Sequence, residues 1–320
     1  MRMVYKKARY SISNVTLARN LTPEEAPTIM IKRLFTCFLV AFACQSSAEP
    51  VILTSIKPLQ LLVTSLYQEQ VSTDYLVDPR FSPHDYALRP SDIRKLRRAD
   101  LIIWVGEDLE PYLGKPLDHF PTPQLEVMAL SDITLRAAAQ QHDDGHYHEL
   151  DPHVWLDIEI MLRLAERLTE KVIKLEPENA ELRRTQLAEF SDRLATTEQR
   201  LQQQLSPHQD KGYFVFHDAY GYFESHFGMN RLGEFTINPQ QRPGARTLSR
   251  IRQQLSQQQA HCIFAEPQFD GAILQGVSEE TGAQIGMLDP MGLAIEANAD
   301  GYFAFLEAMA DDYLACLALN

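Results

Sequence analysis

Two series of short apolar runs alternate with helical patterns, and a long helical stretch separates the two series. The runs that we predict as strands lie at 51–55, 71–77, 101–106 and 125–130, and then at 213–216, 235–237, 262–265 and 285–288. Strands that alternate with helices along a chain indicate a parallel sheet with helices on its faces. We therefore expect an α/β fold made of two parallel-sheet lobes.

The stretch between the two series is helical in pattern. Residues 158–175 have strong helical spacing. Pro177 ends this first run, and a second helical run continues to about residue 205. Apolar residues in that second run recur at spacings of three, four and seven, although most of its residues are polar. A long polar helix suits a rigid connector better than a core element. We predict an N-terminal lobe at 49–157 with a flexible loop at 137–150, a helical segment at 158–207, and a C-terminal lobe at 208–320.

The beginning of the chain has the pattern of an export signal. Basic residues at 32–33 precede an apolar run of about ten residues, and small residues end at Ala48. This order is typical of a secretory signal peptide, here 30–48, cut after Ala48. The run is too short to span a bilayer. A buried core helix and a lipidated Cys44 are the alternatives, but Ala41 is small for a lipidation signal. We interpret 1–29 as a non-native extension that precedes the true start at Met30, and we expect export to the periplasm.

The mature chain is strongly acidic. Seven of the 30 Lys and Arg residues and two of the 43 Asp and Glu residues precede residue 49, which leaves residues 49–320 with a net charge of about −18. Such a surface argues against nucleic acid as a partner, because phosphates attract Lys and Arg. It is compatible with the attraction of cations.

Cleavage of the signal would remove Cys37 and Cys44 and leave Cys262 and Cys316. An even pair of cysteines in an exported protein suggests a disulfide, which would tie a strand in the last third of the chain to the C-terminal helix. Two unpaired, buried thiols are the alternative.

One tract, at 142–157, holds four of the ten histidines together with several acids. This composition is typical of metal binding. Its first half has the character of a mobile, low-affinity metal-collecting loop, whereas His153 stands at the entrance to a folded element. The residues that we assign to the loop are His142, Asp143, Asp144, His146 and His148.

Four candidate ligands follow predicted strands, where open α/β sheets bind their ligands. They are His84, His153, His217 and Asp289, two from each half of the chain. Three imidazoles and one carboxylate suit Zn²⁺ better than Ca²⁺, Mg²⁺ or Mn²⁺. A lone histidine is more often an ordinary surface or hydrogen-bonded residue, and Asp289 before Pro290 could simply be a turn residue. We place His119, His208, His226 and His261 in that ordinary class.

Five segments of the chain resemble the zinc-binding proteins of bacterial ABC importers, the ZnuA-type members of the cluster A-I solute-binding family. They are His84-Asp85-Tyr86-Ala87-Leu88-Arg89-Pro90-Ser91-Asp92, Asp151-Pro152-His153-Val154-Trp155-Leu156-Asp157, Phe216-His217-Asp218-Ala219-Tyr220-Gly221-Tyr222-Phe223, Ala265-Glu266-Pro267-Gln268-Phe269 and Leu288-Asp289-Pro290-Met291-Gly292. The resemblance runs from about residue 50 to the C-terminus. It implies two α/β lobes joined by a long backbone helix, with a metal held in the cleft between them.

The resemblance also implies roles for single residues. His84, His153 and His217 would be ligands, with Asp289 or a water as the fourth. Manganese-binding relatives carry Glu where His217 stands, which favours zinc. The Cys262–Cys316 pair is similar to a disulfide of the zinc group. Some zinc members carry an acid directly before the first histidine, but this chain has Pro83 there.

Together these features predict capture of Zn²⁺ in the periplasm and its delivery to the permease of a zinc ABC importer, by a monomer that is not an enzyme. Four ligands fill a tetrahedral shell, whereas catalytic zinc keeps an open position, and no His-Glu-x-x-His motif is present. Carboxylates that could orient the imidazoles are Asp85, Asp151, Asp218 and Glu266. The alternatives are a manganese or iron carrier of the same family, and an exported zinc hydrolase with Glu266 as its base.

Overall fold

The computed structural model describes residues 49–138, 150–236, 239, 243–257, 260 and 262–319. The chain divides into two compact units, 1–48 and 49–320, and every helix and strand named below belongs to the second unit. The predicted extension, the predicted signal peptide and the five loop residues at 142–148 lie outside the described residues. Within the described ranges, no helix is both long enough and apolar enough to cross a membrane.

The first sheet is parallel and has the order β2-β1-β3-β4. Its strands are β1 (Val51–Thr54), β2 (Ser72–Tyr75), β3 (Leu101–Trp104) and β4 (Gln124–Glu126), and its helices are α2 (Lys57–Tyr67), α3 (Pro90–Arg98) and α4 (Gly114–Leu117). Pro58 lies in the first turn of α2, where its missing N–H costs no helical hydrogen bond. Strands β2 and β4 correspond to the predicted strands 71–77 and 125–130, and both are shorter than predicted.

The second sheet is also parallel, with the order β6-β5-β7-β8. Its strands are β5 (Tyr213–His217), β6 (Arg231–Thr236), β7 (Cys262–Ala265) and β8 (Gln284–Met287). Helices α7 (Gly221–Phe227), α8 (Ala245–Ser256), α9 (Ala272–Thr281) and α10 (Gly301–Leu317) accompany them. The two parallel sheets with their helices confirm the predicted fold class.

Strand β6 differs most from its prediction, which placed a strand at 235–237. The strand begins at Arg231, and its first residues, Arg-Leu-Gly-Glu, lack the apolar run on which the prediction relied. β6 is an edge strand whose residues are mostly half-buried, so polar side chains are tolerated there. Its pairing with β5 also shifts register between Tyr213 and Phe214.

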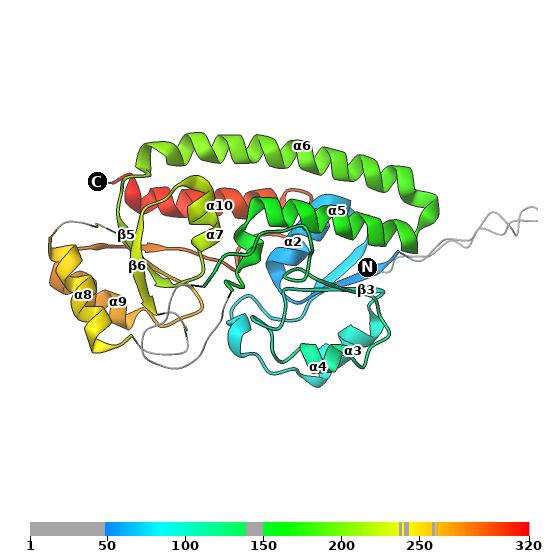
Figure 1. The fold of residues 1–320 in the computed structure, drawn as a ribbon, viewed down its shortest axis with the longest axis horizontal. Helices are drawn as coiled ribbons and strands as arrows, with labels where there is room; N and C mark the ends of the chain where they lie inside the picture. Colours follow the sequence, from blue (N-terminus) through cyan, green and yellow to red (C-terminus); the bar gives the residue numbers. More distant parts are fainter. Residues whose placement is uncertain are drawn as a thin grey trace, which may run out of the picture. The chain divides into compact units, whose positions relative to one another are not determined.

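Two helices form the middle of the chain, α5 (Ile158–Leu175) and α6 (Ala180–Leu205). Asp157 caps α5, because its Oδ1 accepts a hydrogen bond from the Ile160 N–H at 2.9 Å. At the turn between the two helices, the buried Arg183 guanidinium pairs with Glu176 at 2.9 Å. Helix α6 packs against α2 from the first half of the chain and against α7 and α10 from the second half (Figure 1). The predicted domain boundaries at 157 and 207 stay predictions.

One hydrophobic core extends through both halves of the chain, and a second core is confined to the C-terminal half. Side chains of β5 alternate between the two cores: Tyr213 and Val215 belong to the first, and Phe214 and Phe216 to the second. Helix α10 contributes to the first core and packs against α2 and β8, so it links elements of both halves. The loops at the strand ends are therefore held on a shared packed scaffold.

A disulfide joins Cys262, the first residue of β7, to Cys316 near the end of α10, with an S–S distance of 2.09 Å. The pairing and the two elements that it links confirm the sequence prediction.

Candidate metal centre

His84 lies in a short 3₁₀ turn, Pro83–Asp85, between β2 and α3. The Ser82 hydroxyl caps this turn by accepting a hydrogen bond from the His84 N–H at 3.3 Å. Pro83 stands at the first position of the turn, where its fixed φ favours the conformation. The imidazole of His84 is half-buried.

His153 is buried, with 4% of its surface exposed, and Asp151 holds it in place. Oδ1 of Asp151 accepts hydrogen bonds from the backbone N–H of His153 at 3.0 Å and from its Nδ1 at 2.8 Å. Oδ2 of Asp151 accepts one from Arg136 at 2.9 Å. A carboxylate can only accept, so Nδ1 of His153 carries the proton, and in the neutral ring Nε2 presents a lone pair.

His217 is the last residue of β5 and is 3% exposed. Its Nδ1 donates to Oε1 of Glu266 at 2.6 Å, and Glu266 directly follows the neighbouring strand β7. Glu266 is also 3% exposed, so the contact is shielded from water. The same reasoning places the proton on Nδ1 and leaves the lone pair on Nε2 of His217.

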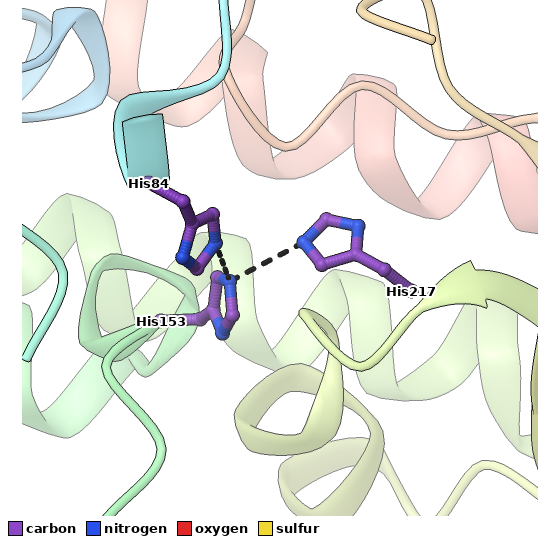
Figure 2. Close-up of side chains that lie close together, drawn as sticks. All are labelled: His84, His153 and His217. Carbon is purple, nitrogen blue, oxygen red and sulfur yellow. Dashed lines mark hydrogen bonds between the residues drawn. The ribbon is translucent and has the colours of Figure 1, made fainter. Parts of the chain in front are cut away.

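The three imidazoles converge from three separate segments, as Figure 2 shows. Nε2 of His153 lies 3.1 Å from Nε2 of His84 and 3.4 Å from Nε2 of His217. Two ligand nitrogens on a tetrahedral zinc, each about 2.0–2.1 Å from the ion, are about 3.3 Å apart. Both separations therefore fit pairs of nitrogens that share one zinc ion.

The imidazoles line a small cavity of about 10 Å³. Trp155, Phe269 and Met291 supply apolar surface to its wall. A space of this size admits about one water-sized sphere. It suits a single ion better than an organic substrate.

Asp289 lies two residues after the end of β8, with its carboxylate engaged locally. Oδ1 accepts from the backbone N–H of Met291 at 3.1 Å and from Nε2 of Gln268 at 3.0 Å, and Oδ2 accepts from the backbone N–H of Leu293 at 2.5 Å. Among the described residues, the group of ligand atoms within 4.8 Å of one another contains the three histidines and not Asp289. Its place as a fourth ligand stays a prediction.

The four carboxylates that we considered as partners of the imidazoles have different environments. Asp151 and Glu266 contact imidazoles directly. Asp85 is exposed, and the carboxylate of Asp218 pairs with Arg231.

The remaining histidines lie elsewhere. His119 is exposed, His208 is half-buried near the end of the long helix α6, and Nε2 of His226 bonds Glu198 at 2.9 Å. His261 lies outside the described residues.

Arg136 and Tyr222 were not anticipated as part of the site. The Tyr222 hydroxyl donates to the backbone oxygen of Asp151 at 2.9 Å and accepts from the Arg136 N–H at 3.1 Å. Because α7 carries Tyr222, these bonds tie the Asp151 loop to the C-terminal half. Tyr222 belongs to one of the segments that carry the family resemblance, but nothing in the sequence indicates this contact.

Comparisons with known proteins identify the family of this chain. A family model described as zinc-uptake complex component A, periplasmic (ZnuA), matches residues 52–316. The high-affinity zinc uptake system protein ZnuA of Yersinia pestis is 39% identical over 292 residues, which cover 84% of this chain and 92% of the relative. The ZnuA protein of Haemophilus ducreyi is 36% identical, over 89% of this chain and 98% of the relative.

Among solved structures, a crystal structure of ZnuA superposes with a TM-score of 0.73 at 23% identity, covering 84% of this chain and all of that one. This similarity bears on the fold alone. Together with the match over residues 52–316, the relatives at 36–39% identity confirm the resemblance. The chain belongs to the ZnuA family of periplasmic zinc-uptake components.

Proposed function

We propose that this protein captures Zn²⁺ in the periplasm and delivers it to the membrane permease of a zinc ABC importer. The observation that carries the proposal is the convergence of His84, His153 and His217: Nε2 of His153 lies 3.1 Å and 3.4 Å from the other two Nε2 atoms, close to the separation of two nitrogens on a tetrahedral zinc. The names of the relatives, which are zinc uptake proteins, support the choice of zinc as cargo. Export would follow from a cleavable signal at 30–48.

The donor set supports zinc over manganese. Imidazole nitrogen suits zinc, whereas manganese prefers oxygen ligands. Two of the three imidazoles are held by buried carboxylates, which raise the basicity of the ligand nitrogen and fix its direction. Asp289 or a water would complete the shell.

A binding role is better supported than catalysis. Membership of a family of uptake components argues for transport. In a hydrolase, Glu266 would have to act as a base on a metal-bound water, but its Oε1 accepts the proton of His217 Nδ1, which ties the carboxylate to the imidazole and leaves only Oε2 for that task. A cavity of about 10 Å³ also leaves no room for an ester or peptide beside the ion.

Native mass spectrometry of residues 49–320, with zinc and manganese titrated against each other, tests the proposal. We expect one zinc ion per chain to be retained against excess manganese, with no turnover of ester or peptide substrates. Equal retention of manganese would favour the alternative carrier, and turnover would favour the hydrolase.

A further inference from the structure

Gln268 joins two segments of the cavity wall that are far apart in the sequence. Its Nε2 donates to the backbone oxygen of Pro79 at 3.0 Å and to Oδ1 of Asp289 at 3.0 Å. Pro79 lies between β2 and the turn that carries His84, in the first half of the chain, and Asp289 follows β8 in the second half. One side-chain amide therefore links the His84 segment to the carboxylate of Asp289.

The chemistry of the two partners fixes the orientation of this amide. A backbone carbonyl and a carboxylate both accept, so the NH₂ group must face them and Oε1 must point elsewhere. Oε1 is buried and has no hydrogen-bond partner among the described residues, and Gln268 lines the same cavity as the three histidines. Buried polar atoms without partners are uncommon in native proteins, so the placement of this side chain calls for an explanation.

The other donors to Asp289 are backbone groups. The N–H groups of Met291 and Leu293 are part of the turn that follows β8. Nζ of Lys57 donates to the backbone oxygen of Leu293 at 3.1 Å, and its charge acts on Asp289. Gln268 is thus the neutral side-chain donor that touches both the carboxylate and the His84 segment.

We propose that Gln268 is a positioning residue that orients Asp289 as the fourth zinc ligand, couples it to the His84 segment, and so slows zinc release. This inference rests on the proposed function. The amide restrains the carboxylate and the segment before His84 together, so both ligands must loosen in concert before the ion leaves. Without the amide, each ligand loosens independently and dissociation becomes faster.

Zinc dissociation into a chelator, followed by stopped flow, measures this effect in the full protein. Gln268→Met has a similar length and no donor, and we expect it to release zinc about 10- to 100-fold faster than the wild type. Gln268→Glu, which has the same shape but cannot donate, repeats the test. The exposed Gln275 on α9 provides the matched control, and Gln275→Met should release zinc at the wild-type rate.

A second background separates positioning from a merely structural contribution. In an Asp289→Ala protein, Gln268→Met should change the dissociation rate by less than about threefold, because the group it orients is absent. An equal acceleration in both backgrounds, or wild-type release from Gln268→Met and Gln268→Glu, would overturn the inference. If the wild type itself fails to hold zinc against the chelator, the proposed function fails first, and the two failures are distinguishable.

Discussion

The buried imidazole of His217 donates through Nδ1 to Oε1 of Glu266 over 2.6 Å. His217 is the last residue of β5, and Glu266 directly follows β7. These two parallel strands pair with each other, which brings the two side chains together. This contact turns the unprotonated Nε2 toward the other two histidines (Figure 2). The pairing of two strands therefore sets the direction of the nitrogen that we propose as a zinc ligand.

Removal of the Glu266 carboxylate should weaken zinc binding. Glu266→Ala leaves the buried Nδ1–H of His217 without its acceptor, and we expect affinity to fall about 10- to 100-fold. Glu266→Gln keeps an acceptor but loses the charge, so its loss should be smaller. Competition with a chelating dye measures both affinities. The exposed Glu279 offers the control Glu279→Gln, and wild-type affinity in a folded Glu266→Ala protein would contradict the assignment.

Deletion of residues 142–148 should leave the tight site intact and remove only weaker zinc binding. The flanks of this loop are already closed together, because Ala137 and Leu150 form an antiparallel bridge and the Asp151 N–H bonds the Arg136 oxygen at 2.9 Å. A shorter connection therefore need not move His153. Calorimetric zinc titration counts the tight and weak sites, and loss of the tight site would refute the division between loop and cleft.

Loss of the disulfide should destabilise the fold without changing the metal ligands. Cys262 and Cys316 are 54 residues apart, and closure of a loop of this size is worth at most about 4 kcal/mol. The double variant Cys262→Ser with Cys316→Ser should lose about 2–4 kcal/mol of unfolding free energy in urea. An unchanged urea midpoint would show that the core alone fixes α10 against β7.

Glu110 should make the protein less stable as pH rises. It is fully buried, and burial raises its pKa from 4.5 to about 7. A carboxyl that is harder to ionise in the folded state takes nothing from the unfolding free energy at a pH below its pKa in the unfolded chain. Its cost grows between about pH 4.5 and 7 and reaches about 3 kcal/mol above that range.

Glu110→Gln removes this ionisation and still offers an acceptor to the Val105 N–H, which Glu110 now bonds at 2.8 Å. The variant should exceed the wild type in unfolding free energy at pH 8, and the difference should shrink toward pH 5. Urea unfolding at both pH values measures the difference, with exposed Glu69→Gln as the control. A gap of the same size at both pH values would exclude titration of Glu110 as its cause.

The sequence was sufficient for the alternation of strands and helices, the cysteine pair and the grouping of three histidines that follow predicted strands. In a parallel sheet all carboxyl ends meet at one edge, so residues after different strands can be grouped without knowing the packing. Four carboxylates were candidates to orient those histidines, and the sequence could not choose among them. Asp218 is next to His217 in the chain, whereas the carboxylate that contacts His217 belongs to Glu266, which follows a neighbouring strand.

Long-range polar contacts were missed for the same reason. Arg136 to Asp151 and Gln268 to Pro79 depend on how loops from different elements meet, which no periodicity encodes. The start of β6 was missed because its pattern is that of a polar edge strand. Local patterns therefore located most of the elements and the three convergent histidines, and tertiary packing determines the polar contacts around them.

The most direct test of the account is the zinc content of the wild type and of His217→Ala after equilibration with a competing chelator. We predict one retained zinc ion per chain in the wild type and none in the variant, because His217 supplies one of three convergent Nε2 atoms. Circular dichroism checks that the variant is folded. Retention of tightly bound zinc by folded His217→Ala would contradict the assignment of this cluster as the capture site.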